Sequence, residues 1–384
     1  MKKKILLMLI VIILIQIALP MVSVIWESGI TIKSQAADTK EATVDGITWT
    51  YTIDNGNATN VKPKDKTTLP TEVIIPSTLN GYSVTSIGGF AFESCHSLRN
   101  IEIPEGVTSI AYFAFWDCSS LTSIEIPEGV TSIGEYVFCG CTSLKSIEIL
   151  EGVKNIGDYA FRYCPCLESI NVNNNNQNYS SKDGVLFTKD KTKIIRYPEG
   201  KEETEYIIPS SVTSIGNGAF EYCKSLNISI PEGVTSIGCY AFKYCAFLTS
   251  IKIPSSVTSI ENHAFEECRS LESIEIPDGV TTIGDDAFIG CSSLTIYCKE
   301  NSVAETYAKE KNIPYVIYED AKGDVNGDKK ADFMDILAIN KHRLGKAELT
   351  GKYLKLADVN GDGKVDFMDI LQINKYRLGK IESL

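Results

Sequence analysis

Histidine is scarce in this chain, and basic residues are in the minority. The 384 residues include three histidines, His96, His263 and His342. None of them belongs to a motif that pairs a nucleophile with a general base. Lysine and arginine number 37 against 49 aspartates and glutamates, which gives a formal net charge of -12. Because affinity for phosphates comes from basic patches, this balance excludes nucleic acid as an expected partner.

Paired carboxylates leave one catalytic alternative open, since two such groups can hydrolyse a glycoside. The candidates recur at a single position of an internal repeat and are Glu102, Glu125, Glu148 and Glu275, with Lys252 interrupting the series. Periodicity explains them better as a solvated strip on a strand face. His96 and His263 fall at variable repeat positions where we expect exposure. We therefore expect that the chain is not an enzyme.

The first 36 residues have the composition of a secretory signal peptide. A basic start, Met1 to Lys4, precedes an apolar stretch, and the small-residue site Ser34-Gln35-Ala36 follows. The apolar stretch is long, so an uncleaved membrane anchor is the alternative. Both interpretations place residues 37–384 outside the cell, as a secreted or surface-associated protein.

A valine-led pattern, Val-x-x-Ile-x-x-x-(Ala/Val)-Phe, fills the middle of the chain. Its copies start 22 or 23 residues apart, apart from one insertion, at Val84, Val107, Val130, Val153, Val212, Val234, Val257 and Val280. A period of 20–29 residues indicates a leucine-rich solenoid, in which each coil buries its apolar face against its neighbours. In one unit we expect a strand from Leu121 to Ile126 and a turn at Pro127-Glu128-Gly129.

Eight of the twelve cysteines lie 11 residues after the valine of their repeat: Cys95, Cys118, Cys141, Cys164, Cys223, Cys245, Cys268 and Cys291. One recurring core position predicts a row of buried free thiols. Disulfides between adjacent coils remain an alternative, because the expected coil spacing overlaps the separations that disulfides permit. The off-register Cys139, Cys166, Cys239 and Cys298 are either free or paired. Their spacing does not suit a zinc site.

The repeat region has an insertion and two expected caps. Residues 171–204 contain an Asn-rich loop and a hairpin formed by Gly184–Thr188 and Lys193–Tyr197, which should extend the sheet. Residues 37–83 should cap the N-terminal end. Val303–Lys311 is expected to be helical and Tyr315–Ile317 a strand, so residues 299–318 should cap the other end.

Two near-identical segments follow, DVNGDKKADFMDILAINKHRLGK at 324–346 and DVNGDGKVDFMDILQINKYRLGK at 358–380, with 19 of 23 positions identical. Each starts with oxygen-bearing side chains at alternate positions, the pattern of a 12-residue calcium loop. Two such loops in register are not explained as ordinary turns. The predicted ligands of two Ca²⁺ ions are Asp324, Asn326, Asp328, Lys330 (carbonyl), Asp332 and Asp335, and Asp358, Asn360, Asp362, Lys364 (carbonyl), Asp366 and Asp369. Gly363 has the glycine expected at the sixth position, whereas the first copy has Lys329.

The paired loops resemble a type I dockerin, the module that docks cellulosomal proteins onto cohesin domains. The stretch before Asp324, residues 318–323, is too short for the helix that precedes an EF-hand loop. Asp335 and Asp369 close the loops, as is usual in dockerins. The repeat pattern over residues 84–298 resembles the leucine-rich repeats of BspA-like bacterial surface proteins. Together the two resemblances imply a β-rich leucine-rich-repeat solenoid, residues 84–318, followed by a small all-α calcium-binding dockerin module, residues 323–384.

The dockerin resemblance also implies which side chains contact cohesin. The corresponding residues are Phe333, Met334, Asn340 and Lys341 in the first copy and Phe367, Met368, Asn374 and Lys375 in the second. Two identical faces would allow docking in two orientations. The alternative is that the Phe and Met side chains pack the core of the module.

These features favour a non-catalytic extracellular binding protein. The dockerin would attach it, through calcium-dependent cohesin binding, to the scaffoldin of a cellulosome-type complex, while the solenoid binds a protein or glycan. Two alternatives stay open at this point. One is a glycan-degrading cellulosomal enzyme component active in polysaccharide catabolism, and the other is a cell-surface adhesin held by an uncleaved N-terminal anchor.

Overall fold

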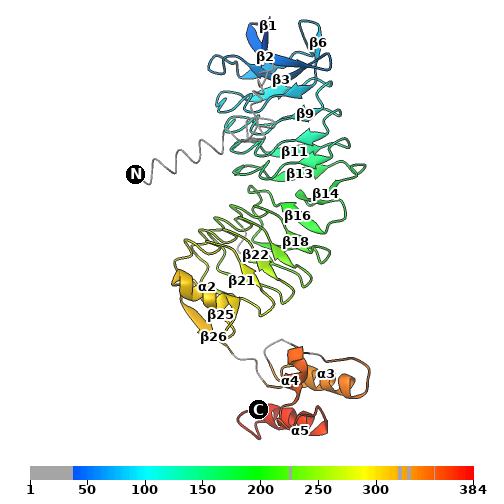
Figure 1. Ribbon diagram of the computed structural model, residues 1–384, viewed down its shortest axis with the longest axis vertical. Coiled ribbons are helices and arrows are strands. Elements are labelled where there is room, and N and C mark those ends of the chain that lie inside the picture. Colours follow the sequence, from blue (N-terminus) through cyan, green and yellow to red (C-terminus); the bar gives the residue numbers. More distant parts are fainter. Residues whose placement is uncertain (1–37, 225–226, 319–321, 327–329, 350) are drawn as a thin grey trace, which may run out of the picture. The chain divides into compact units, whose positions relative to one another are not determined.

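The computed structural model describes residues 38–224, 227–318, 322–326, 330–349 and 351–384. By their contacts, residues 1–38 and 39–384 form two units, and the fold given below is that of the second. The expected signal peptide and most of the linker 319–322 lie outside the described residues. Within the second unit, short coils stack one after another (Figure 1). In the described part of the chain, four helices come after these coils.

The first coils are preceded by a sheet that contains both antiparallel and parallel strand pairs. Its strands are β1 (Lys40–Val44), β2 (Ile47–Asp54), β3 (Asn57–Pro63), β5 (Thr78–Leu79) and β6 (Tyr82–Val84). Trp49 and Tyr51 point into the core from β2 and are 0% and 1% exposed. The Trp49 ring meets the Phe92 ring edge-on at 6.3 Å, so this sheet covers the apolar end of the first coil.

One row of two-residue strands follows the valines of the repeat. These strands are β7 (Ser86–Ile87), β9 (Ser109–Ile110), β10 (Ser132–Ile133) and β12 (Asn155–Ile156), then β18 (Ser214–Ile215), β20 (Ser236–Ile237), β22 (Ser259–Ile260) and β24 (Thr282–Ile283). Neighbours pair in parallel and in register, Ile on Ile. The residue after the strand is Gly in most coils. A Cβ on Gly134 would lie 2.4 Å from the backbone nitrogen of Tyr112, so close coil stacking explains that glycine.

A second row of strands lies on another side of the coils. Its members are β4 (Glu72–Ile74), β8 (Asn100–Glu102), β11 (Ser146–Ile149), β13 (Ser169–Val172), β17 (Glu205–Ile207), β19 (Asn227–Ser229), β21 (Ser250–Lys252), β23 (Ser273–Glu275), β25 (Thr295–Cys298) and β26 (Tyr315–Ile317). The strand expected from Leu121 to Ile126 is not formed, although Leu121, Ile124 and Ile126 are buried as predicted. The backbone contact from Lys145 N to Thr122 O is 3.5 Å long, too loose for regular pairing at this coil.

Stacked phenylalanines form the centre of the solenoid core. Phe92, Phe115 and Phe138 are fully buried, and successive ring centroids are 5.3 and 5.6 Å apart with nearly parallel planes. A second stack runs through Phe220, Phe242, Phe265 and Phe288 at 5.0–5.2 Å. Each ring covers the next, which is the stacking that the repeat predicts.

The cysteine row forms as free thiols, as the single core position predicts. None of the twelve cysteines, all of which lie in the described part of the chain, forms a disulfide. The thiol of Cys118 donates a hydrogen bond to the carbonyl of Phe92 in the preceding coil at 3.0 Å, and Cys141 donates to Phe115 at 3.2 Å. The same contact recurs at Cys164, Cys245, Cys268 and Cys291. Burial raises the pKa of Cys141 well above its ordinary value, so the thiol stays protonated and inert.

The insertion divides the solenoid core into two apolar clusters. It forms β14 (Tyr179–Lys182), β15 (Val185–Thr188) and β16 (Lys193–Arg196), and β16 pairs in parallel with β18, so it extends the sheet as expected. Asn176, in the expected Asn-rich loop, is fully buried and donates to the carbonyls of Leu150 and Val153. Charged side chains bridge the two clusters, because Arg162 lies 2.6 Å from the buried carboxylate of Glu221.

The last coil is followed by helix α2 (Val303–Lys311), over the residues expected to be helical. Ser302 caps its first turn, and Asn312 ends it in the left-handed conformation with φ 56°. Ala304 and Ala308 pack into the second apolar cluster together with Tyr307. Strand β26, over the residues expected to form a strand, then pairs with β25.

Candidate functional site

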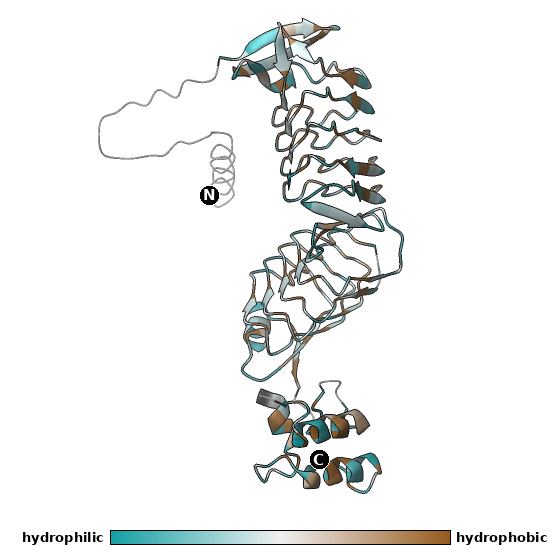
Figure 2. Ribbon diagram, turned by 90° about the vertical axis from the view of Figure 1, so that its right-hand side faces the viewer, coloured by the Kyte–Doolittle hydropathy of each residue, from teal (hydrophilic) through white to brown (hydrophobic). Residues whose placement is uncertain are grey.

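Three helices form the module after the solenoid: α3 (Phe333–Arg343), α4 (Gly351–Ala357) and α5 (Phe367–Arg377). These helices carry both strongly apolar and strongly polar segments (Figure 2). Their small core is built from equivalent positions of the two copies, Val325 with Val359, Ile336 with Ile370, and Ile339 with Ile373. The sequence interpretation did not include α4, which precedes the second loop; the run Tyr353-Leu354-Lys355-Leu356-Ala357 was the available signal.

The second loop is described throughout, and its polar side chains fold inward onto the loop backbone. The carboxylate of Asp358 accepts hydrogen bonds from the N–H groups of Asp362 and Gly363 at 3.0 and 2.8 Å. Asn360 Oδ1 also accepts from Asp362 N at 2.8 Å. Gly363 has φ 84°, a conformation that favours glycine, which explains the residue predicted at the sixth position.

The last aspartate of each loop ties the loop to the helix that follows. Asp335 and Asp369 are fully buried. Asp369 accepts from Asn360 N at 3.2 Å and from Asp366 N at 2.8 Å, and Asp366 in turn caps α5 by accepting from Met368 N. Asp335 makes the same contacts in the first copy, where burial raises its pKa. These reciprocal caps fix the direction of α3 and α5.

The donor set of the second loop fits calcium. Asp358, Asn360, Asp362, Asp366 and Asp369 offer hard oxygens at alternate positions, which suits Ca²⁺ better than zinc or copper. Within the described residues, no three His, Cys, Asp or Glu side chains gather as a formed metal cluster. In the first loop, Asp324 is 6% exposed and Asn326 is exposed, while Asp328 lies outside the described residues.

The Phe-Met pair of each copy lies on the surface and not in the core. Phe333 and Met334 are 57% and 55% exposed, and Phe367 and Met368 are 57% and 51% exposed. The alternative that these side chains pack the core of the module is therefore wrong. Lys341 and Lys375 are exposed, whereas Asn340 and Asn374 are half-buried.

Arginines at the ends of α3 and α5 link the two copies reciprocally. The Arg343 guanidinium lies 6.0 Å from the centre of the Phe367 ring, and Arg377 lies 5.7 Å from that of Phe333. Each arginine also donates to the asparagine three residues earlier, Arg343 to Asn340 and Arg377 to Asn374, both at 3.2 Å. The two helices are therefore related by an approximate twofold axis, and both copies present the same apolar pair beside a guanidinium.

The carboxylates considered for catalysis lie at one recurring position of the coils, where Glu275 is half-buried. Glu102, Glu125 and Glu148 are exposed at one position of successive coils, as a strip would be. His263 was expected to be exposed, but it is half-buried. Its ring stacks on Tyr240 at 4.9 Å, because the preceding coil carries an aromatic ring at this position, and its Nδ1 lies 3.1 Å from Glu266.

Comparisons with known proteins agree with both parts of the molecule. A family model for the BspA type leucine-rich repeat region matches residues 68–183 and 199–309 with six copies, and one for the dockerin type I domain matches residues 322–378. No curated protein matches the chain.

The solved structures that are similar to the chain include the following two. A leucine-rich repeat protein from Eubacterium ventriosum is 27% identical with a TM-score of 0.52, over 67% of this chain and 84% of that one. The pneumococcal vaccine antigen PcpA is 19% identical with a TM-score of 0.50, over 73% of this chain and 99% of that one, and it shows the fold alone. Among the described residues, none of the helices has the length and apolar character needed to cross a membrane.

Proposed function

We propose that this chain, which belongs to the BspA-type leucine-rich repeat family and carries a type I dockerin domain, is a non-catalytic extracellular binding protein. Leucine-rich repeats and dockerins are not catalytic modules, and both are typical of extracellular or cell-surface proteins. Each segment of the chain has a separate role. Residues 1–36 direct export, residues 84–318 bind a protein or glycan, and residues 323–384 attach the protein to the cohesin domain of a scaffoldin.

The exposed Phe-Met pairs are the single observation that carries the docking role. A pair of large apolar side chains more than half exposed on so small a module is typical of an interaction surface. The pair precedes the loop-closing aspartate, where dockerins contact cohesin. Its copy lies on the other side of an approximate twofold axis, so either α3 or α5 offers the same contact residues: Phe333, Met334, Asn340 and Lys341, or Phe367, Met368, Asn374 and Lys375.

Calcium binding positions the two helices that carry these contact residues. One ion per loop is held by the oxygens of Asp324, Asn326, Asp328, Lys330, Asp332 and Asp335, and of Asp358, Asn360, Asp362, Lys364, Asp366 and Asp369. The loop carboxylates repel one another without a cation, and the same aspartates cap α3 and α5. Binding of calcium therefore couples to the placement of both helices.

A cohesin pull-down with three variants tests the docking role. The variants replace Phe333 and Met334 by Ala, Phe367 and Met368 by Ala, or all four; the exposed Lys355→Ala on α4 is the control. We expect either double variant to keep binding, because the other face remains, and the quadruple variant and excess chelator to abolish it. Loss of binding in one double variant would show that the faces are not redundant. Full affinity in the quadruple variant would show that these pairs are not the interface.

A further inference from the structure

Hydrogen bonds between successive coils hold the phenylalanine stack of the solenoid together. The N–H of the repeat phenylalanine donates to a carbonyl of the next coil, from Phe138 to Ala160 and from Phe220 to Ala241, both at 2.8 Å. The same bond forms at Phe92, Phe115, Phe242 and Phe265. Two coils lack a directly following coil, the one that starts at Val153 and the last one, so neither has the usual acceptor for this donor.

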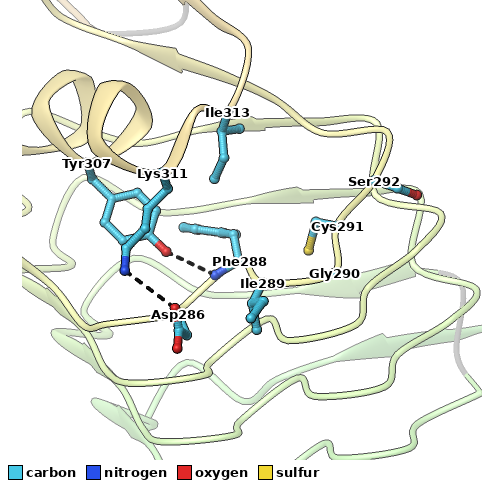
Figure 3. A pocket seen from close by; sticks show the side chains of 9 residues that line it. All are labelled: Asp286, Phe288, Ile289, Gly290, Cys291, Ser292, Tyr307, Lys311 and Ile313. Carbon is cyan, nitrogen blue, oxygen red and sulfur yellow. Dashed lines mark hydrogen bonds and ion pairs between the residues drawn. The ribbon is translucent and has the colours of Figure 1, made fainter.

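At the last coil, a side chain of α2 supplies the acceptor. Phe288 N donates to the hydroxyl of Tyr307 at 3.3 Å, as a dashed line in Figure 3 shows. The Tyr307 ring also meets the Phe288 ring edge-on, with the ring centres 5.9 Å apart. The helix that ends the solenoid therefore provides both an acceptor for the last donor and a cover for the last ring.

The coil that starts at Val153 is followed by the insertion, which forms only part of a coil. Strand β16 pairs with β18 and takes the place of a repeat strand. Tyr197 takes the place of the phenylalanine, because its ring stacks on Phe220 at 5.5 Å. Only two residues lie between Ile194 and Tyr197, whereas four separate the isoleucine from the phenylalanine of a complete coil. This partial coil is therefore too short to present the usual carbonyls to the coil before it.

Two buried donors line the space that the partial coil leaves. A cavity of about 30 Å³ lies there, and its walls include Phe161 and Arg196. Phe161 is 3% exposed, and its N–H has no acceptor among the residues that the structure describes. Arg196 is 5% exposed, and its Nε lacks a hydrogen-bond partner in the same part of the chain. Because unpaired buried donors are unfavourable, a hydrogen-bond acceptor belongs in this cavity.

The charges around the cavity balance one another. The guanidinium of Arg196 pairs with Glu199, and that of Arg162, which also lines the cavity, pairs with Glu221 at 2.6 Å. Two further charged residues of the wall have opposite signs, Lys193 and Asp158. A neutral acceptor therefore suits the cavity better than an anion, whose burial would need an uncompensated cation.

Water is the neutral acceptor that fits. A buried water needs about 10–15 Å³, so the cavity has room for one or two. Water also has protons to donate, and Glu221 Oε2 is a buried acceptor that lacks a hydrogen-bond partner in the described part of the chain. This oxygen lies beside Gly218, a residue of the cavity wall, since a Cβ on that glycine would be 3.4 Å from it.

We propose that ordered water occupies this cavity and makes it a hydrated joint between the two apolar clusters of the solenoid. The water accepts the N–H of Phe161 and of Arg196 Nε in place of the missing carbonyls. Among the described residues, no strand pairing crosses this joint, because one sheet ends at β12, the next starts at β14, and β11 and β13 form a sheet of their own. The clusters on its two sides then open separately. This property goes beyond the proposed binding role and depends on no ligand.

Hydrogen exchange of the full-length protein tests the hydration. Phe138, Phe161 and Phe220 occupy the same repeat position and are all at most 3% exposed, so Phe138 and Phe220 are matched internal controls. We expect the Phe161 amide to exchange at least about 100-fold faster than both, because its N–H is bound to water and theirs to carbonyls. Equal protection of the three amides would overturn the proposal.

A variant that lacks residues 172–207 tests whether the insertion causes this exchange. The deletion joins Asn171 to Ile208 and restores the Ile-x-Ile-Pro-x-x-Val sequence of the repeat ahead of Val212, so a complete coil follows directly. In this fused variant we expect the protection of the Phe161 amide to rise at least about tenfold, because a carbonyl of the next coil replaces water. Unchanged protection in a folded fused variant would count against the joint.

The Phe115→Ala change shows whether the two clusters open separately. In the wild-type background we expect it to speed exchange of the Phe138 amide at least about tenfold and to leave that of Phe242, in the other cluster, within about twofold. In the fused variant it should speed both. Equal acceleration of both amides in the wild-type background would refute the joint. Circular dichroism shows whether the fused variant folds, and the two measurements in the wild-type background are independent of it.

Discussion

Replacing Phe115 by alanine should lower the free energy of unfolding of the solenoid by about 3–5 kcal/mol, the range for emptying a large core site. Phe115 is 0% exposed, and burial of such a ring contributes about 1.5–3 kcal/mol. Its ring also stacks between Phe92 at 5.3 Å and Phe138 at 5.6 Å, and each aromatic contact adds about 0.5–1.5 kcal/mol. The neighbouring rings cannot close the gap without breaking coil stacking, so the cavity stays.

The matched control is Phe247→Ala, the same deletion at a ring that is 56% exposed, which should cost under about 1 kcal/mol. Urea unfolding of both variants gives the free energies. Hydrogen exchange then shows which coils open, because repeat proteins gain stability from neighbouring coils. Protection should fall first in the apolar cluster that contains Phe115 and remain in the cluster that contains Phe265. Equal costs at the two positions would refute the assignment of the phenylalanine stack as the centre of the core.

The remaining predictions concern calcium, thiols and backbone strain. In chelator, the isolated residues 323–384 should lose helical circular dichroism and regain it with calcium, while the solenoid keeps its unfolding transition. Asp358→Ala should lower the calcium stoichiometry by one ion. Equal helicity with and without calcium would contradict the coupling of calcium binding to folding. Burial raises the pKa of Cys95 to about 11 from the ordinary 9.0. The contribution of the protonated thiol to stability is therefore complete below pH 9 and is lost as the pH rises toward 11. A Cys95→Ala variant should show a smaller fall in the urea unfolding midpoint between these two pH values. Tyr136 has φ 54°, so Tyr136→Gly should be more stable than Tyr136→Ala by about 1 kcal/mol in the same urea assay. Ordinarily the alanine variant is the more stable of the two. If alanine is more stable here as well, the backbone at this position is not strained.

The period of the sequence was sufficient to predict the solenoid, because coil stacking repeats every chemical feature at the same interval. The valine, isoleucine, phenylalanine and cysteine positions follow from that interval alone, and the structure buries all of them except Ile156, Ile283 and Cys291, which are half-buried. The end helix α2 was predictable for another reason. Ser302 and the alternation of apolar and charged residues after it are local signals that need no partner.

The positions of positive φ within each coil were not predictable from the residue types. Two positions of each coil adopt positive φ, and most of them carry side chains other than glycine, such as Phe113 at φ 55° and Asp117 at φ 58°. Phe113 stacks between Phe90 and Tyr136 at 4.9 and 4.8 Å, so contacts with the neighbouring coils offset the local strain. Such compensation involves residues 23 positions apart, and no local pattern reveals it.

The two loop segments agree at 19 of 23 positions, and the structure gives a reason for much of this identity. The reciprocal contacts of Arg343 with Phe367 and of Arg377 with Phe333 require the arginine and the phenylalanine in both copies. Where the two copies differ at position 342, their surroundings differ as well. His342, which faces Tyr376 in the alignment, accepts the N–H of Leu349 at 3.1 Å, and Leu349 lies in the connection to α4, which the second copy does not have. A partner that contacts α3 or α5 therefore meets the same Phe, Met, Asn, Lys and Arg in either orientation. Within α3 and α5 the two copies differ at two positions, Ala338 against Gln372 and His342 against Tyr376. Any preference of a cohesin for one orientation is therefore determined at these positions or by residues outside the helices.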